Sequence, residues 1–229
     1  MSTYVLVPGA GSDSAHWNRV RPLLEARGHE VITPDLPAAD PEAGLGAYVD
    51  TIVEAIGDRS GVILVAQSMA GLSAPVAATR ADVALLVLVA AMIPAPGETG
   101  GQWWAATGQP EAQRAADLAA GRDPDAPFDP VVTFLHDLPP DVLDEVLAAP
   151  PIDQSDRPFA DPWPLAAWPD VPTRVLVCRD DRLFPLAFQR RVTRERLGIT
   201  PDEMEGGHLP ALAHPGALVE WLERYREST

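Results

Sequence analysis

The sequence of 229 residues contains no lysine, so all 17 of its basic residues are arginine. Acidic residues number 33, which makes the formal net charge −16 at pH 7. This sign is opposite to the one that neutralises phosphate groups, and we therefore expect no nucleic-acid partner. The single cysteine, Cys178, cannot form an internal disulfide, which is typical of proteins in a reducing compartment.

Long apolar segments are also absent. The longest uninterrupted apolar run, Val83–Ile93, is far shorter than the roughly 20 residues that a membrane-spanning helix requires. The first residues, MSTYVLVPGAG, lack the basic region and the long apolar stretch of a signal peptide. We therefore expect a cytoplasmic protein with no membrane partner, for which a homodimer is one option.

Short apolar runs are what the sequence does contain. Hydrophobic residues make up 46% of the chain, which provides a sizeable core and excludes a disordered chain. Runs of apolar residues alternate with helical patterns, which indicates an α/β fold with a mostly parallel, doubly wound sheet of about six strands. We expect the strands at Tyr4–Val7, Val31–Thr33, Val62–Ala66, Leu85–Val89, Arg174–Cys178 and Pro201–Met204. Between them we expect helices at Trp17–Ala26, Ala47–Ile56, Met69–Thr79, Ala187–Leu197 and Gly216–Arg226.

The segment Pro94–Pro172 interrupts this alternation. It is rich in proline, glycine and aspartate and contains no clear strand. Two helices are expected in it, at Glu111–Ala119 and Val142–Ala148, followed by an extended return over Gln154–Pro172. Because a long insertion in a compact domain is usually functional, we predict a mainly helical cap over residues 94–172 within a single domain of residues 1–229.

Ser68 lies where the buried strand Val62–Ala66 passes into a helix. The small residues Ala66 and Ala70 flank it at the spacing of the pattern G-x-S-x-G. This arrangement resembles the nucleophile elbow of α/β-hydrolases, with alanine in both glycine places. The resemblance implies that Ser68 is a nucleophile, and an ordinary strand-to-helix turn is the alternative interpretation.

The loop after the first strand is the second point of resemblance. In α/β-hydrolases this loop supplies one backbone N–H to the oxyanion hole, and the residue after the nucleophile supplies another. Here these donors would be Ala10 and Met69, although the family usually has His-Gly where this chain has Pro8-Gly9. A dinucleotide-binding loop is the alternative, but the third glycine of that fingerprint is missing. We expect no cofactor and no metal.

An acidic residue and then a histidine follow the serine in α/β-hydrolases. Asp180 and Asp181 lie at the carboxyl end of the strand Arg174–Cys178, where catalytic groups of open α/β sheets gather. The spacing from Asp181 to a later proline matches the family's D-x-x-x-P motif, so the resemblance favours Asp181, with Asp180 as the alternative. His208 follows two glycines after the last strand, which matches the turn that carries the family's histidine base.

The other four histidines have different expected roles. His16 and His29 precede the acidic residue and have polar neighbours, so we expect them to face solvent. His136 lies in the predicted cap, where it could touch a substrate. His214 precedes a proline at a helix start, which is a structural position.

Further segments narrow the resemblance to the branch that contains plant methyl esterases, hydroxynitrile lyases and their bacterial relatives. They are Pro8-Gly9-Ala10 followed by His16-Trp17, Val177–Asp181, and Ala187–Arg190. Lyases of this branch carry a lysine directly after the catalytic histidine and a threonine in the oxyanion loop. Leu209 and Ala10 occupy these places here, so no cation is present to steady a departing cyanide and lyase chemistry is disfavoured.

The resemblance therefore implies a serine hydrolase that cleaves a small-molecule ester through Ser68, His208 and Asp181 and an acyl-enzyme intermediate. Such pockets are mostly apolar, which favours a small hydrophobic or aromatic ester. The candidate pocket residues are Met92, Trp103, Trp104, Phe128, Phe134, Leu135, Trp163 and Leu209. Two other functions stay open: a noncatalytic, receptor-like ligand-binding member of the fold, and a lactonase or cyclase of a biosynthetic pathway.

Overall fold

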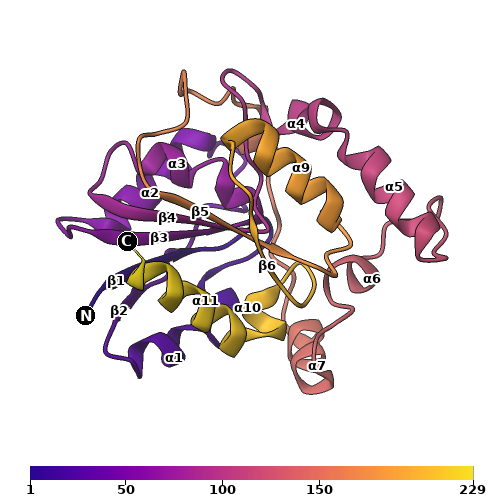
Figure 1. Cartoon of the computed structure of the whole chain (residues 1–229), viewed down its shortest axis with the longest axis horizontal. Helices are drawn as coiled ribbons and strands as arrows, with labels where there is room; N and C mark the ends of the chain where they lie inside the picture. Colours follow the sequence, from indigo (N-terminus) through magenta and orange to yellow (C-terminus); the bar gives the residue numbers. More distant parts are fainter. Residues whose placement is uncertain (229) are drawn as a thin grey trace.

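The computed structural model describes residues 1–228 and contains a six-stranded sheet (Figure 1). The strand order is β2-β1-β3-β4-β5-β6, and every neighbouring pair is parallel. The strands are β1 (Thr3–Val7), β2 (Glu30–Ile32), β3 (Val62–Gln67), β4 (Val83–Val89), β5 (Thr173–Cys178) and β6 (Asp202–Met204). All six predicted strands are confirmed, with boundaries that differ by at most two residues.

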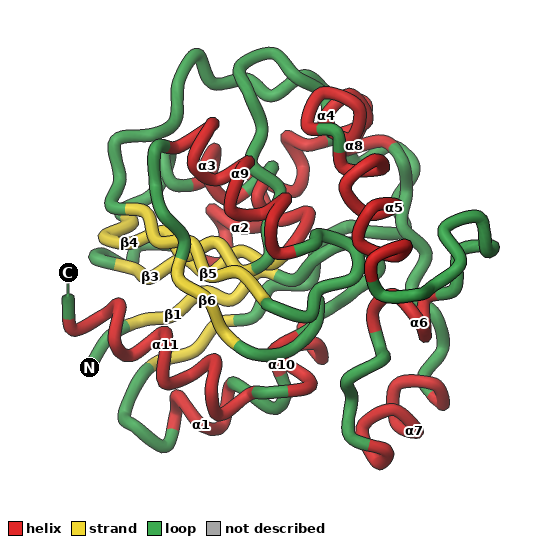
Figure 2. Tube along the Cα trace, turned by 45° about the vertical axis from the view of Figure 1, so that its right-hand side comes forward, coloured by secondary structure: helices red, strands yellow, loops and turns green. Residues whose placement is uncertain are grey.

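Alternate residues along β1, β3, β4 and β5 contact two different apolar cores. Leu64 of β3 belongs to one core and its neighbour Val65 to the other, so the sheet is buried on both faces. Figure 2 shows the two helix layers: α2 (Leu45–Ile56), α3 (Ala74–Ala77) and α9 (Leu186–Leu197) on one face, α1 (Arg21–Glu25) and α11 (Pro215–Glu227) on the other. No helix in residues 1–228 is both long and apolar enough to cross a bilayer.

The strand order reverses at β1, which has β2 on one side and β3 on the other. At such a switch point, the loops that leave the two central strands diverge and open a crevice at the carboxyl ends of the strands. The loop after β1 leads into a short 3-10 helix, η1 (Ser14–Trp17), and β3 leads into a second one, η2 (Ser68–Gly71). The fold therefore places the loop of residues 8–13 beside Ser68.

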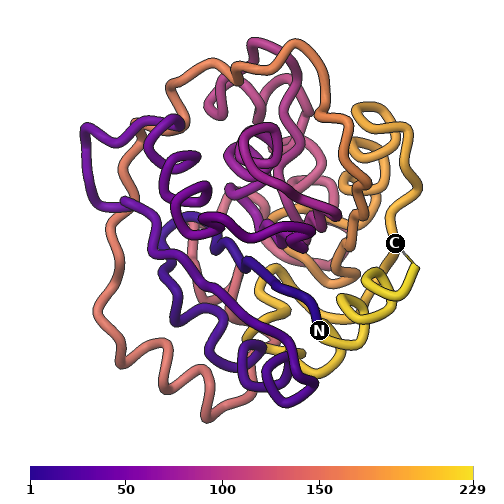
Figure 3. The backbone as a smooth tube through the Cα atoms, turned by 90° about the vertical axis from the view of Figure 1, so that its left-hand side faces the viewer, coloured from indigo at the N-terminus to yellow at the C-terminus, as the bar shows by residue number. Residues whose placement is uncertain are grey.

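Five helices and no strand lie between β4 and β5: α4 (Gly100–Thr107), α5 (Gln109–Ala119), α6 (Pro130–Phe134), α7 (Pro140–Ala148) and α8 (Arg157–Ala160). The expected helices at Glu111–Ala119 and Val142–Ala148 are confirmed as α5 and α7. The predicted extended return over Gln154–Pro172 is wrong in part, because α8 forms within it. Helices α5, α6 and α7 lie beyond the carboxyl ends of the strands, on the side opposite to the start of β1 and the end of α11 (Figures 1 and 3).

Two predicted helices are interrupted. The chain over Met69–Thr79 forms η2 and then α3, which begins only at Ala74. Pro75 has no backbone N–H, so a continuous helical ladder cannot pass through this position. The chain over Trp17–Ala26 likewise divides into η1 and α1, and α1 begins directly before Pro22, a position that proline tolerates.

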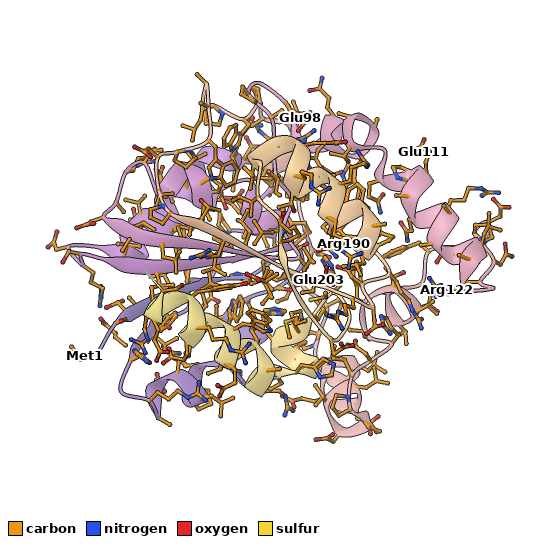
Figure 4. The ribbon with its side chains drawn as sticks, in the orientation of Figure 1. Met1, Glu98, Glu111, Arg122, Arg190 and Glu203 are labelled. Carbon is orange, nitrogen blue, oxygen red and sulfur yellow. The ribbon has the colours of Figure 1, made fainter. Side chains whose placement is uncertain are left out.

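A partly buried ion pair ties the segment 94–172 to α9. Arg196 donates through Nη2 to Glu98 Oε1 at 2.8 Å, and its Nη1 contacts the other carboxylate oxygen and the Ile93 carbonyl. The two side chains are only 16% and 9% exposed. Figure 4 shows Glu98 next to α9, and lower down the exposed pair of Arg190 with Glu203.

Removing the charge of Glu98 leaves the Arg196 guanidinium without its counter-charge in a largely buried place, although Nη1 still contacts the Ile93 carbonyl. We therefore expect Glu98→Gln to lower the free energy of unfolding by about 3 kcal/mol, measured by urea denaturation. Glu195→Gln is the matched control, since its pair with Arg191 is 57% and 44% exposed and is expected to contribute under about 1 kcal/mol. If the two variants lost the same free energy of unfolding, the Arg196–Glu98 pair would not have the larger stabilising role that its burial predicts.

Candidate active site

Ser68 occupies the turn between β3 and η2 with a backbone φ of 53°. Positive φ is strained for a residue with a Cβ, and strain of this kind is typical of a nucleophile elbow. The Met92 N–H donates to the Ser68 carbonyl at 2.9 Å and holds this conformation. A Cβ on Gly71 would lie 1.9 Å from the Met92 carbonyl oxygen, so only glycine permits this close approach. The alanines in the two glycine places, Ala66 and Ala70, are fully buried.

Three side chains from three strand ends meet in one hydrogen-bonded chain. His208 Nε2 lies 2.9 Å from Ser68 Oγ, and His208 Nδ1 lies 2.8 Å from Asp181 Oδ2. The other carboxylate oxygen of Asp181 accepts the backbone N–H groups of Leu183 and Phe184 at 2.9 and 2.8 Å. With its proton on Nδ1, a neutral His208 donates a hydrogen bond to the Asp181 carboxylate and accepts one at Nε2 from the Ser68 hydroxyl. The structure thus brings together all three side chains singled out in the sequence.

Asp180, the alternative acid, points elsewhere. Its Oδ2 accepts the Gly206 N–H at 3.2 Å, and its own N–H donates to the Gly206 carbonyl at 3.0 Å. Asp137, which sequence reasoning did not identify, accepts the next N–H of the same loop, that of Gly207, at 2.6 Å. The carboxylates of Asp180 and Asp137 thus hold the loop that carries His208. Of the adjacent residues Asp180 and Asp181, only Asp181 lies at hydrogen-bond distance from the imidazole.

The expected oxyanion donors flank Ser68. Ala10 and Met69 line the same cavity as the serine, and no hydrogen bond within residues 1–228 engages either of their backbone N–H groups. The loop approaches the elbow closely, because a Cβ on Gly9 would lie 2.9 Å from Ser68 Cβ and 2.4 Å from Gln67 Oε1. Gln67 itself was not predicted, yet its Nε2 donates to the His208 carbonyl at 3.0 Å and connects the elbow to the histidine loop.

A cavity of about 540 Å³ opens over Ser68, and we call it the Ser68 cavity. Six of the eight predicted pocket residues line it: Met92, Trp104, Phe128, Phe134, Leu135 and Leu209. Its further apolar walls, which were not predicted, include Phe159, Leu183, Phe184 and Leu212. No arginine of residues 1–228 lines it, so the cavity has no cationic side chain. This environment suits an uncharged, apolar ligand.

Two of the predicted pocket residues do not line the Ser68 cavity. Trp103 and Trp163 are 1% and 2% exposed and pack into the core beneath the cavity. Their indole N–H groups donate to the Ile93 and Leu72 carbonyls at 2.9 and 3.1 Å. A tryptophan with a satisfied N–H and a fully buried ring acts as a core anchor, and neither ring reaches the ligand space.

The expectation that His16 and His29 face solvent is also wrong, since they are only 6% and 8% exposed. His29 accepts the Ser2 N–H at 3.2 Å and contacts Glu223 at the same distance, far from the cavity. His16 instead lines the Ser68 cavity. Burial and the nearby His208 lower the pKa of His16 to about 4.

The remaining titratable side chains lie outside the Ser68 cavity. His136 and His214 gather around Asp137 on the far side of the histidine loop, so His136 does not touch the ligand space. Cys178 is fully buried, and burial raises the pKa of its thiol. Within residues 1–228 no group of three or more histidine, cysteine, aspartate or glutamate side chains has the arrangement of a metal site.

Comparison with known proteins agrees with this geometry. A family model described as the alpha/beta hydrolase family matches residues 4–221. The chain belongs to the alpha/beta hydrolase family. Its parallel sheet and the helices on both faces are the fold of that family, as the sequence predicted.

Two relatives of this α/β-hydrolase are named as a hydrolase and a methylesterase. The pyrethroid hydrolase of Sphingobium wenxiniae is 28% identical over an alignment of 251 positions. The alignment covers 98% of this chain and 87% of the relative. Methylesterase 7 of Arabidopsis thaliana is 38% identical over 104 residues, 40% of each chain. These relatives confirm the predicted resemblance to the branch of plant methyl esterases.

Solved structures share the fold over almost the whole chain. A pyrethroid hydrolase from Sphingobium faniae superposes with a TM-score of 0.73 at 24% identity, covering 99% of this α/β-hydrolase and 97% of the other chain. Polyneuridine aldehyde esterase superposes with a TM-score of 0.75 at 19% identity, covering 99% of both chains. At these identities the superpositions establish a common architecture.

Proposed function

We propose that this α/β-hydrolase is a serine esterase that cleaves a hydrophobic or aromatic ester. The observation that carries the proposal is the hydrogen-bonded chain from Ser68 Oγ through His208 to Asp181, with distances of 2.9 and 2.8 Å, on the wall of an apolar cavity. This constellation performs acyl transfer on several unrelated folds. The names methylesterase 7 and polyneuridine aldehyde esterase, which two of the similar proteins carry, support an ester as the bond that is cleaved.

The geometry supports a two-step reaction. His208 Nε2 accepts the Ser68 proton while Oγ attacks the ester carbonyl carbon, and the N–H groups of Ala10 and Met69 stabilise the resulting oxyanion. The tetrahedral intermediate expels the alcohol, which takes the proton from His208 and leaves an acyl group on Ser68. Water then attacks the acyl group and gives its proton to His208, which returns a proton to Oγ as the carboxylic acid leaves. Asp181 stays ionised throughout and stabilises the imidazolium.

The walls of the Ser68 cavity favour an uncharged substrate. Most of its walls are rings and aliphatic side chains, which suit apolar groups of a substrate, and no arginine of residues 1–228 lines it to pair with a substrate anion. Leu209 lines the cavity at the place where the related lyases carry lysine, which favours hydrolysis over cyanohydrin cleavage. Because one relative is named as a pyrethroid hydrolase, pyrethroids are a substrate class to test.

A panel of p-nitrophenyl esters, methyl esters, pyrethroids and lactones tests the proposal. We expect the wild type to hydrolyse uncharged hydrophobic esters with a higher kcat/KM than matched esters that carry a carboxylate. Turnover confined to lactones would favour a lactonase. If the wild type cleaved none of the panel and did not react with a fluorophosphonate probe, a noncatalytic, ligand-binding member of the fold would be favoured.

Asp137 provides a separate test of how the base is positioned. Its 2.6 Å bond to the Gly207 N–H holds the loop that carries His208, so we expect Asp137→Ala to lower kcat about tenfold with little change in KM. Asp137→Asn keeps an acceptor oxygen and should retain most of the activity. Asp144→Ala is the control, since this exposed aspartate lies on α7 away from the loop. Wild-type kcat in Asp137→Ala would show that the loop holds its position without this bond.

A further inference from the structure

Gln154 connects the segment 94–172 to the loop that carries the oxyanion donor Ala10. Its Oε1 accepts the Gly11 N–H at 3.1 Å, and the two residues are 143 positions apart in the sequence. Of the four N–H groups of residues 9–12, only that of Gly11 has a hydrogen-bond partner within residues 1–228. The direction of the backbone in this part of the loop therefore depends on a side chain that the distant segment supplies.

The bond fixes the peptide plane next to the one that presents the oxyanion donor. The Gly11 N–H belongs to the peptide unit between Ala10 and Gly11, and the Ala10 N–H belongs to the unit before it. Because peptide units are planar, only the two backbone torsions of Ala10 separate the planes. Holding the second plane thus restricts the direction of the Ala10 N–H, which has to point to the place that the ester oxyanion will occupy.

Hydrogen bonds of its own amide nitrogen hold Gln154 in place. Nε2 donates to Tyr48 Oη at 3.0 Å and to the Ser155 carbonyl at 2.9 Å. Tyr48 belongs to α2 and is 1% exposed in one of the two apolar cores, so it is a firm support. The N–H of Ser155 donates to the Ala38 carbonyl at 2.8 Å. The partners also define which end of the amide is which, since a carbonyl can only accept and the Gly11 N–H can only donate.

The backbone of the same segment lies against the loop at Gly11. Gly11 has a φ of 60°, which glycine adopts without strain, and a Cβ there would lie 3.4 Å from the Ile152 carbonyl oxygen. Gln154 does not line the Ser68 cavity. Any effect of its side chain on the reaction therefore passes through the loop.

From these contacts we infer that Gln154 is a positioning residue of the oxyanion hole, which keeps the Ala10 N–H directed at the oxyanion by fixing the peptide plane between Ala10 and Gly11. This inference rests on the proposed esterase function. It makes Gln154 important for the tetrahedral state of the reaction and unimportant for binding of the planar ester, because the carbonyl oxygen carries a full negative charge only in the tetrahedral state.

A matched pair of ketones separates the two states. Ser68 Oγ adds to the carbonyl carbon of 1,1,1-trifluoro-4-phenylbutan-2-one, which turns the carbonyl oxygen into an oxyanion while the serine proton moves to His208. The analogue 4-phenylbutan-2-one lacks the activating fluorines and binds as the planar ketone. The inhibition constants of both ketones, with kcat and KM for p-nitrophenyl butanoate, are measured for the wild type and for Gln154→Met. Methionine keeps the length of the side chain and removes its donor and its acceptor.

We expect Gln154→Met to raise the inhibition constant of the trifluoromethyl ketone about tenfold and to lower kcat by a similar factor, which is less than the loss of a whole oxyanion donor would cause. KM and the inhibition constant of the methyl ketone should change less than about twofold. Gln113→Met is the matched control and should leave all four values near those of the wild type. Gln113 is another half-buried glutamine of the segment 94–172, which bonds Gln109 at 2.9 Å and does not line the Ser68 cavity.

Tyr48→Phe tests the support of Gln154 while the glutamine stays in place. This variant removes one of the two acceptors of Nε2, so we expect the same selective loss at a smaller size, about threefold. Because both substitutions act through one chain of contacts, adding Tyr48→Phe to Gln154→Met should cause little further loss. If Gln154→Met does not fold, the values of Tyr48→Phe decide, and unchanged values would overturn the role of Gln154.

The outcomes separate the two proposals. Ester turnover by the wild type, with kcat and the inhibition constant of the trifluoromethyl ketone unchanged in Gln154→Met, would overturn the role of Gln154 and leave the esterase function intact. Equal weakening of the two ketones would also overturn it, since the side chain would then act on the whole pocket. Absence of turnover for every ester in the wild type would overturn the esterase function and this inference with it.

Discussion

Replacing Ser68 with alanine is expected to lower kcat for ester hydrolysis by about a million-fold, to the rate that binding and the oxyanion donors alone support. The reason is that Oγ is the atom that forms the bond to the acyl group and that lies 2.9 Å from the base, His208 Nε2. Release of p-nitrophenol from a hydrophobic ester under saturating substrate measures the effect. The variant should retain the fold, because the side chain that remains fits the same turn.

Ser73→Ala is the matched control for this experiment. Ser73 is another buried serine, 2% exposed, and its hydroxyl makes one long hydrogen bond of 3.4 Å to the Ala70 carbonyl. It lies one turn beyond the elbow and does not line the Ser68 cavity. We expect near wild-type kcat in this variant, and a Ser68→Ala enzyme with comparable activity would contradict the assignment of the nucleophile.

Asp181→Asn is expected to lower kcat about ten-thousand-fold at neutral pH, with little change in stability. One carboxylate oxygen of Asp181 accepts the N–H groups of Leu183 and Phe184, so the amide oxygen of an asparagine would keep that place. Its NH2 group would then face His208 Nδ1 and force the imidazole proton onto Nε2. In that tautomer the histidine cannot accept the Ser68 proton.

Asp180→Asn separates the two neighbouring aspartates. Because Asp180 bonds the Gly206 backbone and not the imidazole, we expect this variant to lose less than tenfold in kcat. The value of kcat is measured for both variants at the same neutral pH and with the same hydrophobic ester. A larger loss in Asp180→Asn than in Asp181→Asn would reverse the assignment.

The strands were predictable from the sequence because this sheet is covered on both faces. Strands β1, β3, β4 and β5 each contain a continuous apolar run of four to seven residues, which leaves few other structures. The two cores that receive Leu64 and Val65 show why both faces required apolar side chains. The helix after Ser68 was less predictable. Apolar content there indicates one long helix, whereas Pro75 and the strained serine divide it into two short pieces.

The members of the hydrogen-bonded chain could be identified because each follows a strand end in the order that the family shows. Their supporting contacts could not, because they join distant positions: Gln67 reaches the His208 carbonyl across 141 residues, and Asp137 reaches Gly207 across 70. His16 was missed for a similar reason. Polar neighbours in the sequence suggested a solvent-facing side chain, whereas the packing of η1 against α10 (Pro210–Ala213) buries it.

Aromatic content alone did not distinguish pocket from core. Trp103 and Trp104 are adjacent in α4, yet only Trp104 reaches the Ser68 cavity, since neighbouring residues of a helix point in different directions. The N–H of Trp103 finds its partner in the Ile93 carbonyl, ten residues earlier in the chain. Only the three-dimensional arrangement of the helices between β4 and β5 decides which ring faces the ligand.

Trapping the acyl-enzyme tests the central claim most directly. Wild-type protein is mixed with excess p-nitrophenyl acetate, quenched in acid after a few milliseconds to seconds, digested and analysed by mass spectrometry. We predict an acetyl group on the peptide that contains Ser68, located on Ser68 itself, together with a burst of p-nitrophenol of up to one equivalent when deacylation is slower than acylation. Asp181→Asn should accumulate this adduct more slowly. Turnover of the ester with acetylation at another residue, or a fluorophosphonate adduct that maps elsewhere than Ser68, would contradict the account.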